Sequence, residues 1–157
     1  KSPTCTADDI EACKKLAKLA GIDIEEYGRA MFKAGSNIES RTPKDLFNRD
    51  FKKFSVGDVV IGVGQVNCME QEEVQNIKVK MKDYISTVTG DNGMDMVFFM
   101  ITNVLDGGSE VLCSGKNASA TISQAFNVGT TDDSVYLDGV VSRKKQMLPA
   151  IMEALQQ

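Results

Sequence analysis

Apolar residues recur along the chain with two different periods, and the change of period separates helices from strands. A helical period predicts helices over residues 6–21, 24–34, 42–48, 71–88 and 118–126, with a short helical tail over 148–155. Near-continuous apolar runs predict strands over 51–56, 59–67, 96–101, 110–113 and 135–141. This order predicts an α/β fold, with a mixed β-sheet of about five strands flanked by helices and an N-terminal helical arm.

The boundaries of several elements carry their own signals. Thr6, Asp23 and Thr42 each stand just before an expected helix, where a side-chain oxygen accepts hydrogen bonds from the first free N–H groups. Gly62-x-Gly64 lies inside the apolar run 59–67 and not at a strand-to-helix turn, which argues against a dinucleotide-binding loop. We expect residues 1–22 to form a linker or helical arm and residues 23–157 to form one domain.

Bulk composition excludes several kinds of function. The chain has 157 residues and a formal net charge of -4, so a general nucleic-acid surface is not expected. No apolar run is long enough for a membrane span, and the first residues do not resemble a signal peptide. The four cysteines form no C-x-x-C pair, which favours reduced thiols and a cytoplasmic protein.

The sequence contains no histidine, which limits the chemistry that this chain can perform by itself. Histidine is the side chain whose unperturbed pKa lies near neutrality, and the usual serine or cysteine nucleophile depends on it. The residues therefore exclude a serine–histidine or cysteine–histidine nucleophile within the chain. Any catalysis must use carboxylates, lysines or a metal, or be completed by residues outside it.

A basic segment, Ser142-Arg143-Lys144-Lys145-Gln146, stands between the last expected strand and the helical tail. Arginine offers a planar fork of donors to phosphate oxygens, and lysine offers a compact charge. Proline is tolerated only in the first turn of a helix, so Pro149 predicts a helix that begins between Lys145 and Leu148. Ser142, Arg143 and Lys144 should then lie in a loop. The alternative is a solvated basic surface without a ligand.

The second expected helix carries another pair of cations. Arg29 and Lys33 are four residues apart and repel each other, which would favour an anion nearby. The opposite stripe of the helix is expected to be buried; it consists of Ile24, Tyr27, Ala30, Met31 and Ala34. Lys33 also precedes Gly35, so it could instead complement the carbonyl groups at the end of the helix.

The basic segment, continued to Met147-Leu148-Pro149, resembles the signature near the end of family II, manganese-dependent inorganic pyrophosphatases. Met31-Phe32-Lys33-Ala34-Gly35 resembles a second block of that family, and Gly64-Gln65-Val66-Asn67 also fits it. The opening residues 1–6 resemble the linker that leaves the catalytic domain. The resemblance covers essentially the whole chain.

The resemblance implies a two-domain enzyme in which an N-terminal DHH-type domain binds manganese or cobalt. The C-terminal domain, which this chain resembles, closes over the substrate. Lys33, Arg143 and Lys144 are implied as pyrophosphate ligands, with Ser142, Lys145, Gln146 and Arg29 as secondary candidates. The metal-binding half lies outside this sequence, so the fragment alone should be inactive.

The implied partners are pyrophosphate and the N-terminal DHH domain, with a homodimer as a further expectation for the full-length enzyme. Two alternatives stay open at this stage. A related DHH phosphoesterase could cleave polyphosphate or nucleotide phosphates with the same plan. A non-catalytic anion-binding or interaction module could use the basic segment to dock an acidic partner.

Overall fold

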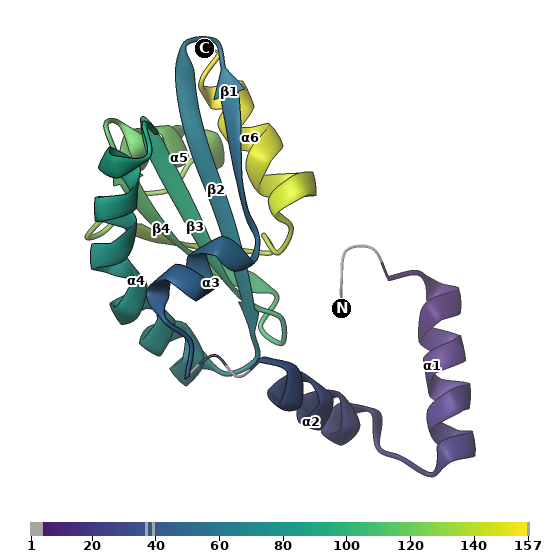
Figure 1. Ribbon diagram of the computed structural model, residues 1–157. Coiled ribbons are helices and arrows are strands. Elements are labelled where there is room, and N and C mark those ends of the chain that lie inside the picture. The colour runs from purple at the N-terminus through teal and green to yellow at the C-terminus, as the bar shows by residue number, and fades with distance from the viewer. Residues whose placement is uncertain (1–4, 37, 39, 157) are drawn as a thin grey trace.

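The computed structural model describes residues 5–36, 38 and 40–156, and for Lys33, Gly35 and Ser36 it describes the backbone alone. A five-stranded sheet forms the body, in the order β1-β2-β3-β4-β5 (Figure 1). The strands are β1 (Phe51–Val56), β2 (Val59–Cys68), β3 (Met96–Asn103), β4 (Gly108–Gly115) and β5 (Ser134–Asp138). β2 and β3 are parallel and the other neighbours are antiparallel, which confirms the predicted mixed sheet.

Four helices cover the two faces of this sheet: α3 (Pro43–Arg49), α4 (Gln71–Asp91), α5 (Ala118–Phe126) and α6 (Leu148–Ala154). The chain also forms α1 (Ala7–Ala20) and α2 (Ile24–Ser36), and a π-helical turn, η1 (Arg143–Met147), precedes α6. α3 and α4 pack on one face in a core that includes Leu46, Ile77 and Phe99. α5 and α6 pack on the other, around Phe98, Ile122 and Ile151. α1 and α2 extend away from the sheet (Figure 1).

The starts of α1 and α3 form as the sequence predicts. The Thr6 hydroxyl accepts a hydrogen bond from the Asp9 N–H, and Thr42 does the same for Asp45. In each case the carboxylate reaches back to the threonine, which lowers the pKa of Asp9 and of Asp45 below the usual value. α4 is three residues longer than predicted, but its expected buried face is confirmed; that face consists of Val74, Ile77, Met81, Ile85 and Val88.

The two glycines of β2 explain how the sheet packs at its centre. A β-carbon on Gly64 would lie 2.7 Å from the Phe99 ring, and one on Gly62 would lie 2.7 Å from the Phe51 ring. Aromatic rings therefore occupy the space that side chains would take at these positions. The glycines serve packing within a strand, in agreement with the argument against a dinucleotide-binding loop.

The predicted buried stripe of α2 is wrong for this chain. Tyr27 is 56% exposed and Met31 is 61% exposed, and Ile24, Ala30 and Ala34 are exposed as well. The periodicity correctly identified a helix, since α2 does form. It could not tell whether another element covers the apolar stripe, and in this structure α2 points away from the body of the sheet (Figure 1).

The four cysteines fall into two environments, which gives a chemical prediction. Cys5 and Cys13 are exposed, whereas Cys68 and Cys113 are buried and burial raises the pKa of each to about 12. Because the thiolate is the reactive form, we expect iodoacetamide to alkylate Cys5 and Cys13 in the native protein and to leave the buried pair unmodified. Mass spectrometry of the labelled peptides measures this, with guanidinium-denatured protein as the control in which all four react. Native labelling of Cys68 or Cys113 would contradict the fold around them.

Among the helices that the structure describes, none combines the length and the apolar character needed to cross a bilayer.

Candidate functional site

The basic segment forms a π-helical turn, and two of its polar side chains shape that turn. The Ser142 Oγ accepts a hydrogen bond from the Lys145 N–H at 3.2 Å. The Gln146 Oε1 accepts from the N–H groups of Val141 and Ser142, both at 3.0 Å, and its Nε2 donates to the Gly139 carbonyl at 2.7 Å. The side chains of Ser142 and Gln146 therefore form their hydrogen bonds with the local backbone.

The expectation that Arg143 and Lys144 lie in a loop is wrong. Both belong to η1, because the N–H of Met147 bonds to the Ser142 carbonyl and that of Leu148 bonds to the Arg143 carbonyl, each five residues back. The α-helical part begins at Leu148, within the range that Pro149 predicts. Single π turns of this kind are frequent at functional sites.

The last strand is also shorter than predicted, and its end directs the basic segment across the sheet. β5 ends at Asp138, and Gly139 has a left-handed backbone with φ +70°. The chain then crosses the ends of the strands, held by side chains: Ser109 Oγ of β4 donates to the Val140 carbonyl at 2.6 Å, and Gln65 Nε2 of β2 donates to the Val141 carbonyl at 2.9 Å. This crossing delivers η1 from the β5 edge to β2.

Arg143 is fixed at several points where it reaches β2. Its Nη2 lies 2.7 Å from the Asp50 Oδ1, and its Nη1 donates to the carbonyls of Asp50 and Val63. Its backbone N–H donates to Gln65 Oε1 at 3.3 Å. The Arg143 side chain is only 12% exposed, whereas that of Asp50 is 51% exposed. The guanidinium is therefore held in one orientation, and it is partly screened from water.

The two lysines that follow are placed differently. Lys144 and Lys145 are both exposed on η1, so their ammonium groups remain hydrated. A hydrated ammonium on a flexible stem can move toward an anion at little cost, whereas the held Arg143 guanidinium needs little movement.

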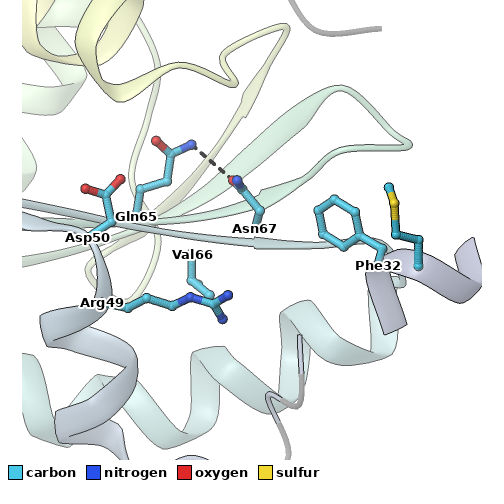
Figure 2. Close-up of a pocket in the computed structure, with 7 residues that line it drawn as sticks. Phe32, Arg49, Asp50, Gln65, Val66 and Asn67 are labelled. Carbon is cyan, nitrogen blue, oxygen red and sulfur yellow. Dashed lines mark hydrogen bonds between the residues drawn. The ribbon is translucent and has the colours of Figure 1, made fainter. Parts of the chain in front are cut away.

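A pocket of about 290 Å³ adjoins this arrangement. Its lining residues come from α2, the end of α3 and β2; they are Met31, Phe32, Arg49, Asp50, Gln65, Val66 and Asn67. Figure 2 shows Gln65 and Asn67 close together on β2, with a hydrogen bond of 3.4 Å between them, and Phe32 reaching in from α2. Asp50 and Gln65 therefore have two roles: they hold Arg143, and they line the pocket.

The cations of α2 are only partly accounted for. Lys33 follows the pocket-lining Phe32 in α2, but its side chain lies outside what the structure describes, so its convergence with Arg143 and Lys144 stays a prediction. Arg29 lies 3.6 Å from Glu70 Oε1, just before α4, and both side chains are more than half exposed. Arg29 therefore connects α2 to the start of α4 and is not among the residues that line the pocket.

Among the residues that the structure describes, metal-binding side chains do not cluster. Within the described residues, no three side chains among Cys, Asp and Glu are grouped so that they could hold an ion. The described residues therefore do not fit a manganese or cobalt site, and no chemical step is assigned to a metal held by this chain.

Comparison with known proteins identifies the family. The DHHA2 domain matches residues 29–154. The manganese-dependent inorganic pyrophosphatase of Bacillus subtilis is 39% identical over 155 residues, which cover 99% of this chain and 50% of that protein. The cobalt-dependent inorganic pyrophosphatase of Clostridium perfringens is 37% identical over 155 residues, which cover 99% of this chain and 28% of that protein.

A solved structure agrees with these matches. The crystal structure of a protein from Methanococcus jannaschii, described as a candidate family II inorganic pyrophosphatase, superposes with a TM-score of 0.80 and is 38% identical. The match covers 99% of this chain and 50% of that chain, so the present chain spans about half the length of such relatives, or less. By its matched residues, 29–154, the chain belongs to the DHHA2 domain family.

Proposed function

We propose that the chain is the C-terminal, substrate-binding half of a manganese- or cobalt-dependent inorganic pyrophosphatase, which hydrolyses diphosphate to two phosphates. The observation that carries the proposal is that Asp50 and Gln65, which line a pocket together with residues of α2, also hold Arg143. Arg143 itself is not among the residues that line the pocket. The relatives named as inorganic pyrophosphatases, of which this chain spans half or less, support the same assignment.

In this proposal the chain supplies positive charge to the phosphate oxygens. Hydrolysis of a phosphoanhydride spreads negative charge over the transferring phosphoryl group and the leaving phosphate, and fixed cations stabilise that charge. Arg143, Lys144 and Lys33 are the proposed ligands, and Lys145 and Arg29 are secondary. Ser142 and Gln146 act through the shape of η1. A metal bound by the N-terminal DHH domain would supply the activated water.

The proposal extends to the organisation of the whole protein. Residues 1–22 would be the arm that connects the DHH domain to the domain formed by residues 23–157, and the full-length enzyme would be a homodimer. A cytoplasmic location also belongs to the proposal, and the four free thiols are in keeping with a reducing compartment.

The direct test is the activity of the full-length protein that contains this chain. We expect manganese-dependent release of phosphate from pyrophosphate, little release from tripolyphosphate or nucleotides, and no activity from the present chain alone. A preference for tripolyphosphate or nucleotides would instead indicate that the protein is a related DHH phosphoesterase. If none of these substrates releases phosphate, the chain would instead be a non-catalytic anion-binding module.

Lys144→Ala in the full-length protein tests one of the proposed ligands. We expect turnover of pyrophosphate to fall by about a hundredfold, at the lower end of the effect of removing a transition-state donor, because the Lys144 ammonium is hydrated. Steady-state phosphate release measures it. Lys82→Ala is the matched control, since Lys82 is exposed on α4, away from η1. Equal turnover of the Lys144→Ala and Lys82→Ala proteins would remove Lys144 from the site.

A further inference from the structure

Three polar side chains on adjacent strands form a chain of hydrogen bonds beneath the basic turn. Gln65 of β2 donates through Nε2 to Thr102 Oγ1 of β3 at 2.9 Å, and Thr102 lies 2.8 Å from Ser109 Oγ of β4. Thr102 and Ser109 are directly opposite each other in the β3–β4 register, and they are 1% and 0% exposed. We call Gln65, Thr102 and Ser109 the polar ladder.

The direction of these hydrogen bonds follows from counting protons. The single hydroxyl proton of Ser109 is donated to the Val140 carbonyl at 2.6 Å. Thr102 must therefore donate its own proton to Ser109, which leaves the Thr102 oxygen free only to accept. Its partner on the other side must be a donor, so the Gln65 amide places Nε2 toward Thr102.

The orientation of the Gln65 amide then decides which of its atoms faces the backbone N–H of Arg143. With Nε2 turned to Thr102 and to the Val141 carbonyl, Oε1 is turned to the backbone N–H of Arg143. The reverse orientation would set an amide NH₂ against the Arg143 N–H and an oxygen against the Val141 carbonyl. Both contacts would be repulsive, so the ladder permits one orientation.

We propose that the polar ladder is a positioning device: Thr102 and Ser109, which are buried and are not among the residues that line the pocket, fix the Gln65 amide and through it the place of Arg143 relative to the phosphates. The effect of the ladder on catalysis rests on the proposed function, whereas its effect on the position of Arg143 does not. A buried polar network that is fully satisfied makes its surroundings rigid, and a small displacement of a charge from reacting phosphates can cost about a hundredfold in rate.

Thr102→Val tests the ladder, because valine keeps the branched shape of threonine and removes both the donor and the acceptor. In the full-length protein we expect kcat for pyrophosphate to fall about tenfold to a hundredfold. Hydrogen exchange at the Arg143 amide should be about tenfold faster or more, since its acceptor is no longer held. Thr102→Ser keeps the hydroxyl and should restore both values.

The matched control is Thr121→Val. Thr121 is a buried threonine of α5 on the same face of the sheet, but its hydroxyl lies 3.5 Å from Met96 Sδ, at the start of β3 and far from the ladder. It should change neither kcat nor Arg143 exchange. If Thr102→Val does not fold, Ser109→Ala removes the far end of the ladder and should show the same two changes.

The outcomes separate this proposal from the proposed function. Wild-type kcat and unchanged Arg143 exchange in Thr102→Val would overturn the ladder, and so would a Thr102→Ser protein as impaired as Thr102→Val. A wild-type protein that does not hydrolyse pyrophosphate would overturn the proposed function alone. The exchange of the Arg143 amide in the same variants would then still support the ladder or overturn it.

Discussion

Replacing Arg143 by glutamine in the full-length protein is expected to lower kcat for pyrophosphate by about a hundred- to a thousandfold. The Arg143 guanidinium is held by the Asp50 carboxylate and by the carbonyls of Asp50 and of Val63 in β2, so little reorganisation is needed when charge develops on a nearby phosphate. Glutamine keeps hydrogen-bonding ability but has no charge. It also removes the cation that pairs with the Asp50 carboxylate, so that carboxylate would repel a phosphate bound at the proposed site.

The rate should be measured at saturating pyrophosphate, together with the melting temperature, so that lost turnover is separated from lost structure. Lys116→Gln is the matched control; it removes one exposed cation in the turn after β4, at the end of that strand remote from Ser109. A second variant, Arg143→Lys, keeps the charge and removes the planar fork, and it should remain at least tenfold impaired. Full turnover in Arg143→Gln would reject the site.

Gly115→Ala is expected to destabilise the protein by about 3 kcal/mol and to lower its melting temperature by roughly 6–12 °C. Gly115 ends β4 with φ +104°, a backbone conformation that side chains disfavour. A β-carbon there would also lie 2.1 Å from the carbonyl oxygen of Asp95, which is backbone and cannot turn aside. The backbone strain at position 115 and the steric clash with Asp95 therefore both destabilise the variant.

Thermal unfolding followed by circular dichroism measures this effect. Gly90→Ala is the matched control, because Gly90 lies in α4 and a β-carbon there meets nothing within 4 Å. That variant should be more stable by about 0.5–1 kcal/mol, since alanine loses less chain entropy than glycine in a helix. The two glycine-to-alanine changes should thus have opposite signs, and a Gly115→Ala protein that melts with the wild type would contradict the geometry of β4.

Local signals in the sequence predicted most of the fold. Capping residues such as Thr6 and Thr42 fix helix starts through contacts three residues away, which a sequence displays directly. The continuous apolar runs of β2 and β3 identified the central strands, and these are the parallel pair covered by helices on both faces. Such features need no knowledge of distant residues.

The site depended on contacts that sequence patterns do not contain. The sequence could single out the basic segment as a candidate phosphate site, but not that Asp50, 93 residues earlier, would hold Arg143. The π-helical turn was missed because Pro149 constrains only the α-helical part of that segment. Gln65 belonged to a motif of the resemblance, yet its role emerges only when Thr102 and Val141 are brought beside it.

The sequential order of the strands bears on how the protein is assembled during synthesis. Each strand from β2 to β5 pairs with the strand made just before it, so the sheet can grow outward from one edge as the polypeptide emerges from the ribosome. β2 and β3 are parallel, so they need a long connection before they can pair, and α4 lies in it; α5 lies in the connection between β4 and β5. The turn with Arg143 follows β5, so it can settle onto β2 only after the whole sheet is complete. A nascent chain halted before that point would have a nearly complete sheet but would still lack Arg143 and Lys144, two of the three proposed phosphate ligands.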